Sequence, residues 1–134
     1  MTAFQLKIVT PDGLEYEGAV EEVVVRTTTG DIGIRAGHIN CVAPLGMGRA
    51  MLLIDGKPRY AACIGGMISV VNGQVHIVAT TFEWANEIDV SRAEASEKRA
   101  RTMLSDKTAA DTDLRLAEAR LKRALVRKSV EQMK

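Results

Sequence analysis

The stretch MISVVNGQVHIVAT, residues 67–80, carries the clearest fold signal in the chain. Two runs rich in β-branched residues flank the dipeptide Asn72-Gly73, which suits the two positive-φ positions of a type I′ turn. The backbone twist of this turn matches that of two paired antiparallel strands. The stretch therefore predicts a β-hairpin and, with it, an antiparallel sheet.

Further strands precede this hairpin, and turn-forming residues separate them. Their alternating or β-branched patterns fall at residues 4–9, 14–17 and 20–26, with a second hairpin over residues 47–64 around Asp55-Gly56. Gly65-Gly66, between the two hairpins, predicts a bulge or a close approach of two backbones. Because no helical pattern separates these strands, we expect an antiparallel β-sandwich or barrel, and we favour the sandwich.

The sequence period changes from that of a strand to that of a helix after residue 88. Ser91 and Glu94 form a capping box, and Asp89 is a competing cap, so a helix should begin here and run to about Leu104. Its apolar stripe is thin, and it consists of Ala93, Ala100 and Leu104.

A second helix should follow a short polar connection. Thr108 or Asp111 can cap it, and the helical pattern runs to about Met133. Its apolar stripe is also narrow, and it consists of Leu114, Ala117, Leu121 and Leu125. Two helices joined by a short loop pack as antiparallel neighbours. So thin a seam buries little apolar surface, and we expect this helical hairpin to need a ligand, the sandwich or a partner to hold its position.

Composition divides the chain in the same place. All 11 glycines, all 3 prolines and every aromatic residue lie at or before Trp84. Residues 1–84 carry six basic and eight acidic side chains, whereas residues 85–134 carry twelve and nine. We therefore expect an α+β protein of two domains: an N-terminal antiparallel β-sandwich over residues 1–84 and a C-terminal antiparallel helical hairpin over residues 88–134.

The overall composition excludes several classes of protein. A chain of 134 residues with 46% hydrophobic residues can bury an ordinary core, which argues against disorder. The net charge of +1 gives no general argument for binding nucleic acid or an anionic membrane. No apolar run approaches the ~20 residues of a membrane span, and Lys7 interrupts the early apolar stretch, so we expect neither a transmembrane segment nor a signal peptide.

The chain shows no arrangement of residues that predicts catalysis. His38 and His76 stand in no recognisable nucleophile or metal-binding motif. Cys41 and Cys63 lie in apolar surroundings without CxxC spacing, which favours two buried thiols in a reducing compartment. We therefore expect a non-catalytic protein with no metal site and no covalently bound cofactor.

One set of charged residues in the helical hairpin suggests a ligand. Asp89, Arg92 and Arg99 lie on the first helix, where Arg92 and Arg99 share a face, and Arg123 and Arg127 share a face of the second. Antiparallel folding would bring Arg123 and Arg127 opposite Arg92 and Asp89. Converging guanidinium groups with one carboxylate suit a nucleoside polyphosphate, although a solvated face with internal ion pairs would use the same residues.

The order of motifs along the chain resembles the epsilon subunit family of bacterial F-type ATP synthases. The resemblance covers essentially the full length, and it is carried by residues 9–13 (VTPDG), 30–38 (GDIGIRAGH) and 64–66 (IGG), followed by the Ala- and Arg-rich helical hairpin. It implies a sandwich that docks on the gamma subunit and the membrane-embedded c-ring. It also implies a mobile hairpin that folds against the sandwich, or extends into the alpha/beta catalytic head and inhibits ATP hydrolysis.

Members of this family from bacilli bind ATP through an Ile-Asp-x-x-Arg-Ala motif, and residues 88–93 (IDVSRA) match it at every specified position. The resemblance thus implies a regulatory ATP site made by Glu83, Ile88, Asp89, Arg92, Ala93, Arg99, Arg123 and Arg127. It further implies a c-ring contact loop that includes Asp31 and His38, and a peripheral location on the cytoplasmic face of the bacterial cell membrane.

Two other functions fit parts of the sequence. One is a free-standing ATP-sensing module outside any rotary machine. The other is a nucleic-acid-binding sandwich with a basic arm, but the arm has no aromatic residue after Trp84 and carries many interleaved acidic residues. We therefore expect no nucleic-acid partner.

Overall fold

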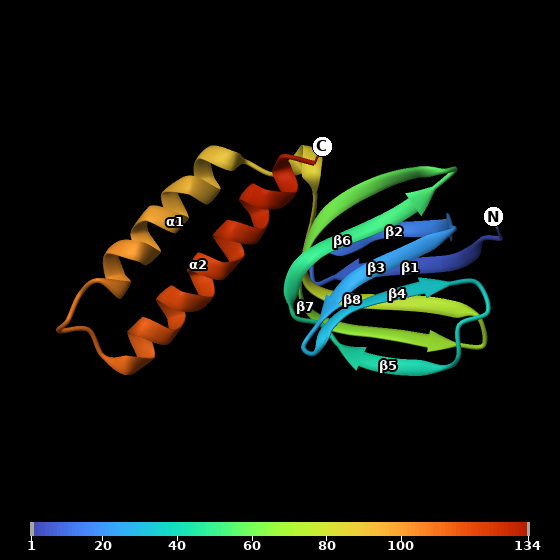
Figure 1. Cartoon of the computed structure of the whole chain (residues 1–134), viewed down its shortest axis with the longest axis horizontal. Helices are drawn as coiled ribbons and strands as arrows, with labels where there is room; N and C mark the ends of the chain where they lie inside the picture. Colours follow the sequence, from blue (N-terminus) through green and yellow to red (C-terminus); the bar gives the residue numbers. More distant parts are fainter. Residues whose placement is uncertain (1, 134) are drawn as a thin grey trace.

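The computed structural model describes residues 2–133. Met1 and Lys134, which the predicted domain ranges 1–84 and 88–134 include, lie outside the described residues. Eight strands precede a short 3₁₀ turn and two helices (Figure 1). Their bounds are β1 Phe4–Thr10, β2 Gly13–Val20, β3 Glu22–Thr27, β4 Gly30–Arg35, β5 Cys41–Pro44, β6 Met47–Ile54, β7 Lys57–Val71, β8 Gln74–Trp84, η1 Ala85–Glu87, α1 Val90–Leu104 and α2 Asp111–Glu131.

The strands form one eight-stranded sheet within the described residues, in the order β2-β1-β8-β7-β6-β3-β4, with β5 paired to β7. The sheet curves round on itself, and its inner faces enclose the main core (Figure 1). Fully buried Leu6, Ile8, Leu52, Ile68 and Ile77 come from strands that are far apart in the sequence. The predicted β-sandwich followed by a helical hairpin is confirmed.

Both predicted hairpins are present, and their turns explain why. Asn72 and Gly73 have φ values of 50° and 80°, and Asp55 and Gly56 have values of 51° and 75°, so each pair occupies the two left-handed positions of a type I′ turn. Strand β7 is antiparallel to both β6 and β8. One pairing departs from the antiparallel expectation, because β1 runs parallel to β8. These are the first and last strands, so no tight turn constrains their relative direction.

The Gly65-Gly66 pair marks a close backbone approach and not a bulge. The two predicted strands on either side of it are one continuous strand, and the β7–β8 register runs through the pair without a shift. A side chain at Gly66 would collide with the carbonyl oxygen of Val78. This approach keeps the backbones of β7 and β8 tightly apposed.

Helix α1 begins and ends close to its predicted limits. The Asp89 side chain caps it by accepting a hydrogen bond from the backbone N–H of Arg92, so Asp89, and not Ser91, is the cap. Helix α2 differs more, since Ala110 occupies its cap position without a side-chain hydrogen bond. The Thr108 hydroxyl and N–H instead donate to Asp106 in the preceding turn, and the helix ends at Glu131 instead of about Met133.

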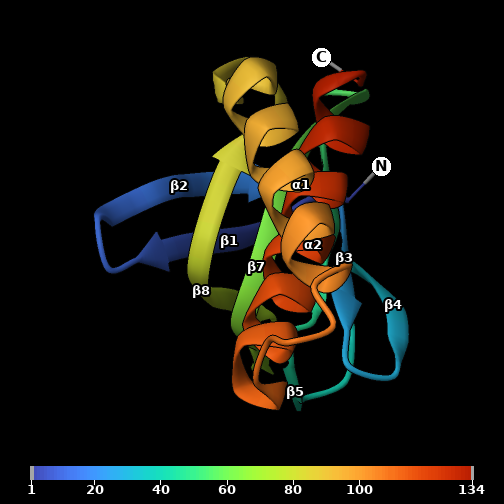
Figure 2. The same ribbon diagram turned by 90° about the vertical axis from the view of Figure 1, so that its left-hand side faces the viewer.

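The two helices are antiparallel and lie side by side (Figure 2). The side chains buried along their seam are small. Ala93 and Ala100 of α1 and Ala117 and Ala124 of α2 are buried there. Leu125, which the sequence placed on the seam, is 41% exposed, and Ala124 lies there in its place. Alanine permits close approach of the helix axes but buries little apolar surface per residue.

Helix α2 attaches the hairpin to the sandwich, near β6 and β7. A second small core forms at this junction from Ala62, Ala85, Ile88 and Val130, with Tyr60 and Val126 packed against it. The Arg49 guanidinium also donates to the sulfur of Met133 at 3.4 Å. The hairpin is therefore fixed at its sandwich end, and its other end projects away from the sheet (Figure 1).

Candidate functional site

A charge pair joins the sandwich to the hairpin beside the small junction core. Alternation along β8 turns the Glu83 side chain away from the main core, and Arg127 reaches it from α2 with an Nε–Oε1 distance of 2.6 Å. The two helices are joined to each other by Lys128 and Glu97, whose Nζ–Oε1 distance is 3.0 Å. Two clefts lie on this side of the molecule, between the hairpin and the sheet.

The first cleft has a volume of about 600 Å³ and contains most of the predicted nucleotide site. It is lined by the predicted residues Glu83, Asp89, Arg92, Ala93, Arg99 and Arg127. Three further acidic residues, Asp12, Glu15 and Glu87, also line it. Acidic side chains therefore outnumber basic ones in this cleft, and they offer acceptors for hydroxyl and amino groups.

The second cleft is wider, about 890 Å³, and its charge is the opposite. Its basic lining residues are Arg99, Arg120, Arg123 and Arg127, whereas Asp113 is the acidic residue recorded in its wall. Arg123, which the spacing placed with Arg127 opposite Arg92 and Asp89, lines this second cleft and not the first.

Most of these arginines have no carboxylate partner. Within residues 2–133, Arg92, Arg99, Arg120 and Arg123 form no ion pair, whereas Arg127 is paired with Glu83. The internal ion pairs of a purely solvated face are therefore missing from these four side chains. Unpaired guanidinium groups around a concave surface attract phosphate or carboxylate groups.

Two of the predicted site residues serve the fold as well. Ile88 is 8% exposed in the small junction core and does not line either cleft. Asp89 lines the first cleft, but one of its carboxylate oxygens already caps α1. The match to the Ile-Asp-x-x-Arg-Ala motif thus combines residues that position the hairpin with residues that face the cleft.

Sequence reasoning missed two residues of the cleft walls. Arg120 lines the wide cleft, and a signal for it existed because Arg120, Arg123 and Arg127 stand at i, i+3 and i+7 on one helical face. Thr81 lines both clefts and stands two residues before Glu83, so strand alternation gives it the same face. Neither belongs to the motif that directed attention to this region.

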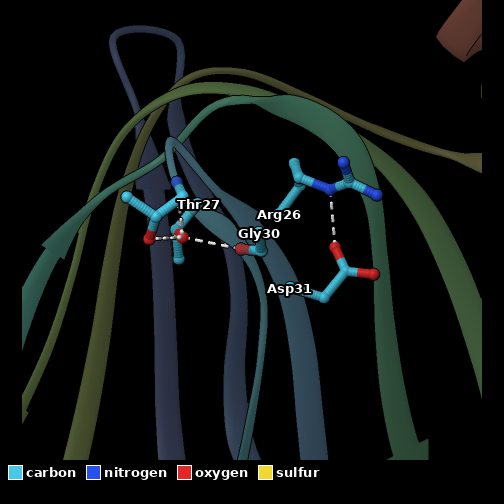
Figure 3. A network of polar contacts seen from close by, with 5 residues as sticks. Arg26, Thr27, Gly30 and Asp31 are labelled. Atoms are coloured by element: carbon cyan, nitrogen blue, oxygen red, sulfur yellow. Dashed lines mark hydrogen bonds and ion pairs between the residues drawn. The ribbon is translucent and has the colours of Figure 1, made fainter.

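Asp31 and His38, the predicted contact residues of the sandwich, lie at opposite ends of β4. Asp31 follows the β3–β4 turn, where its carboxylate accepts from Nε of Arg26 at 2.7 Å (Figure 3). The Thr27 hydroxyl closes the same turn by donating to the Gly30 carbonyl oxygen at 2.6 Å. His38 lies beyond the other end of the strand, on the order of 20 Å away along an extended chain. The structure therefore does not bring them into one loop.

The two cysteines are free thiols, but they are not equally buried. Burial raises the pKa of Cys63 to about 12. Cys41 is only partly buried, and its sulfur lies 3.9 Å from Nδ1 of His38. Among residues 2–133, no group of three or more His, Cys, Asp or Glu side chains is placed to hold a metal ion.

Fold and clefts together define a class: a β-sandwich protein with a C-terminal two-helix arm and an arginine-lined junction between them. Family models agree with both halves. The model described as "ATP synthase, Delta/Epsilon chain, beta-sandwich domain" matches residues 3–85, and that described as "ATP synthase, Delta/Epsilon chain, long alpha-helix domain" matches residues 86–130.

Curated relatives match over the full length. The ATP synthase epsilon chain of Bacillus velezensis is 45% identical over 130 residues, which are 97% of this chain and 98% of the relative. That of Bacillus cytotoxicus is 44% identical over 134 residues and covers all of both chains. A chain of the Euglena gracilis mitochondrial ATP synthase has a TM-score of 0.84 at 21% identity, and covers 96% of this chain and 81% of its own length.

A second solved structure, the central stalk and c-ring of the Tetrahymena thermophila mitochondrial ATP synthase, contains a chain with a TM-score of 0.62 at 11% identity, over 95% of both chains. The present chain belongs to the delta/epsilon family of ATP synthase subunits, as a non-catalytic member of the epsilon type. The predicted family and the predicted lack of catalytic function are thereby confirmed.

Proposed function

We propose that this chain is a central-stalk subunit of the rotor of a proton-translocating ATP synthase, where it couples proton flow to ATP synthesis. Full-length similarity to bacterial epsilon chains supports this role, and the fold shared with a chain of a central-stalk structure agrees with it. Neither helix within residues 2–133 is long and apolar enough to cross a membrane. The subunit would act on the cytoplasmic face of the bacterial cell membrane, as a peripheral protein.

The sandwich, residues 1–84, would provide the docking surfaces for the gamma subunit and the c-ring. Apolar side chains on its surface support such contacts, since Ile39 is 77%, Val42 63% and Val71 53% exposed. Asp31 and His38 would belong to two separate contacts, because β4 holds them apart.

The hairpin, residues 88–134, would regulate ATP hydrolysis, and ATP would hold it folded. The observation that carries this proposal is the set of unpaired arginines, contributed by both helices, that faces the sandwich across the two clefts. A polyphosphate bound there would bridge α1, α2 and β8, and so would stabilise the docked hairpin by RT ln(1 + [L]/Kd). When ATP falls, the hairpin would open, and its basic face would engage acidic surfaces of the alpha/beta head.

Removal of the hairpin from the assembled ATP synthase tests this role. Hydrolysis would be measured across ATP concentrations for the intact enzyme and for an enzyme that lacks residues 88–134. We expect the intact enzyme to be inhibited at low ATP and released at high ATP, and the truncated enzyme to hydrolyse ATP without inhibition at all concentrations. Identical profiles would remove the regulatory role and leave only the coupling role of the sandwich.

A further inference from the structure

The two clefts form one continuous surface. Four residues line both of them, namely Thr81, Ser96, Arg99 and Arg127. These residues come from β8, α1 and α2, so the junction between the clefts is the place where sandwich and both helices meet. A single elongated ligand can therefore occupy both clefts.

The two clefts carry opposite charge, so the two ends of this surface differ. The first cleft contains five acidic side chains, Asp12, Glu15, Glu83, Glu87 and Asp89, against three arginines. The wide cleft contains four arginines against Asp113. A nucleotide has hydrogen-bond donors at its nucleoside end and negative charge at its phosphate end. The phosphates therefore fit the wide cleft, and the nucleoside fits the acidic one.

An unsatisfied hydroxyl lies at the junction. The Thr81 side-chain oxygen is shielded from water and has no hydrogen-bond partner within residues 2–133. Buried polar atoms without partners are rare in proteins because they lose their hydration without compensation. An oxygen of a ligand bound at the junction would give this hydroxyl a partner.

We propose that Arg120 and Thr81 are ligand contacts: Arg120 binds the polyphosphate tail of a nucleoside triphosphate in the wide cleft, and the Thr81 hydroxyl donates to the ligand where the two clefts meet. This inference rests on the proposed ATP site and adds two residues to it. It also predicts that the site distinguishes nucleotides by the length of the phosphate chain, because only a long tail reaches Arg120.

Calorimetric titration of the full chain with ATP and with AMP tests the role of Arg120. We expect Arg120→Ala to weaken ATP binding about tenfold, equal to about 1.4 kcal/mol, and to change AMP binding less than about twofold. Arg115→Ala is the matched control, since Arg115 is an exposed arginine of the same helix that lines neither cleft. It should bind both nucleotides like the wild type.

Thr81→Val tests the hydroxyl through two measurements, because valine keeps the shape and removes the oxygen. We expect ATP affinity to fall about threefold or more, while the melting temperature without nucleotide stays the same or rises. A lower melting temperature without nucleotide would show that the hydroxyl has a structural partner, and would overturn its assignment as a ligand contact.

These measurements distinguish an error in the two added contacts from an error in the ATP site itself. If wild-type chain binds ATP and both variants bind it like Arg115→Ala, the added contacts are wrong and the proposed ATP site stands. If Arg120→Ala weakens AMP and ATP equally, the orientation of the ligand is wrong. If the wild-type chain does not bind ATP, both the proposed site and this extension of it are overturned.

Discussion

Arg127 illustrates how single charged residues contribute at the junction. Its bond to Glu83 is short, but the two side chains remain 26% and 36% exposed. Ion pairs with this much access to water contribute about 0–1 kcal/mol, because solvent screens the attraction. The pair therefore helps to orient the hairpin but contributes little to the free energy that docks it. The neighbouring unpaired arginines add repulsion that a bound anion would relieve.

The two thiols, Cys41 and Cys63, should also differ in reactivity because they differ in burial. At pH 8 we expect iodoacetamide to label Cys41 in the folded chain and to leave Cys63 unmodified, as measured by mass spectrometry of peptides. The thiolate is the reactive form, and burial raises the pKa of Cys63 to about 12.

Because this pKa lies above the ordinary value of 9.0, folding keeps Cys63 protonated. The resulting contribution to stability is complete below pH 9 and is lost as the pH rises towards 12. Unfolding in urea is the control, since it should make both cysteines react. Equal labelling of the two thiols in the native chain would contradict the burial of Cys63.

At the scale of elements, the hairpin depends on its attachment more than on its own seam. The four buried alanines of the seam bury little apolar surface. The free energy gained from this burial is small compared with the conformational entropy lost when two helices become ordered. The junction core supplies larger side chains, and Val130 and Ile88 are its largest fully or nearly buried aliphatic members. Local opening of the hairpin should therefore begin at its free end and be limited by this core.

Truncation of one junction side chain tests this dependence. We expect Val130→Ala to cost about 2 kcal/mol of the free energy that docks the hairpin, and to speed amide exchange in α2 roughly 30-fold. Exchange in the main sandwich core should not change. Leu125→Ala is the control, because Leu125 is 41% exposed on the same helix. Similar effects of the two substitutions would show that the junction core does not determine docking.

The sequence allowed most elements to be predicted, for local reasons. Asn72-Gly73 and Asp55-Gly56 each specify a tight turn by their positive φ values, and both hairpins follow from them. The parallel β1–β8 pairing could not be predicted, because it joins Gln5 to Gln74 without any local signal. Thr108 was a candidate cap for α2, but its hydroxyl donates to Asp106 instead. Residue type alone does not decide between these two local hydrogen bonds.

The candidate site was predictable only where it follows a motif or a helical face. Arg92 and Arg99 were predicted from their spacing on one helix, and both line the first cleft. That Arg123 lines a different cleft from Arg92 could not be predicted, because a residue count across the hairpin does not give the rotation of α2 about its axis. Thr81 could not be found, since its unsatisfied hydroxyl depends on the packing of helices against β8.

At the scale of the whole molecule, opposite charges are divided between the two halves. The sandwich has an excess of acidic residues and the hairpin an excess of basic ones, so the net charge of +1 is a cancellation. The junction lies where these two parts meet. Added salt should lower the affinity of this junction for an anion, because it screens the charges. Binding of ATP should consequently act on the placement of the hairpin and leave the sandwich unchanged.

Amide hydrogen exchange with and without ATP tests this division. At ATP about 100 times above its Kd, we expect exchange that requires hairpin opening to slow roughly 100-fold, because binding stabilises the docked state by about 2.7 kcal/mol. Strand amides in the sandwich core should not respond. Arg92→Ala should lose most of the protection, and Arg101→Ala, an exposed arginine of α1 outside both clefts, should keep it. Uniform slowing in both halves would contradict a local site.

The position of β8 in the sheet has a mechanical consequence. The hairpin follows this strand after the short turn η1, and β8 lies between β1 and β7 instead of at an edge. A load pulled along the extended helices would shear several ladder hydrogen bonds at once, whereas an edge strand could be peeled off one bond at a time. A hairpin that follows a central strand is therefore anchored to the sandwich more firmly than one that follows an edge strand.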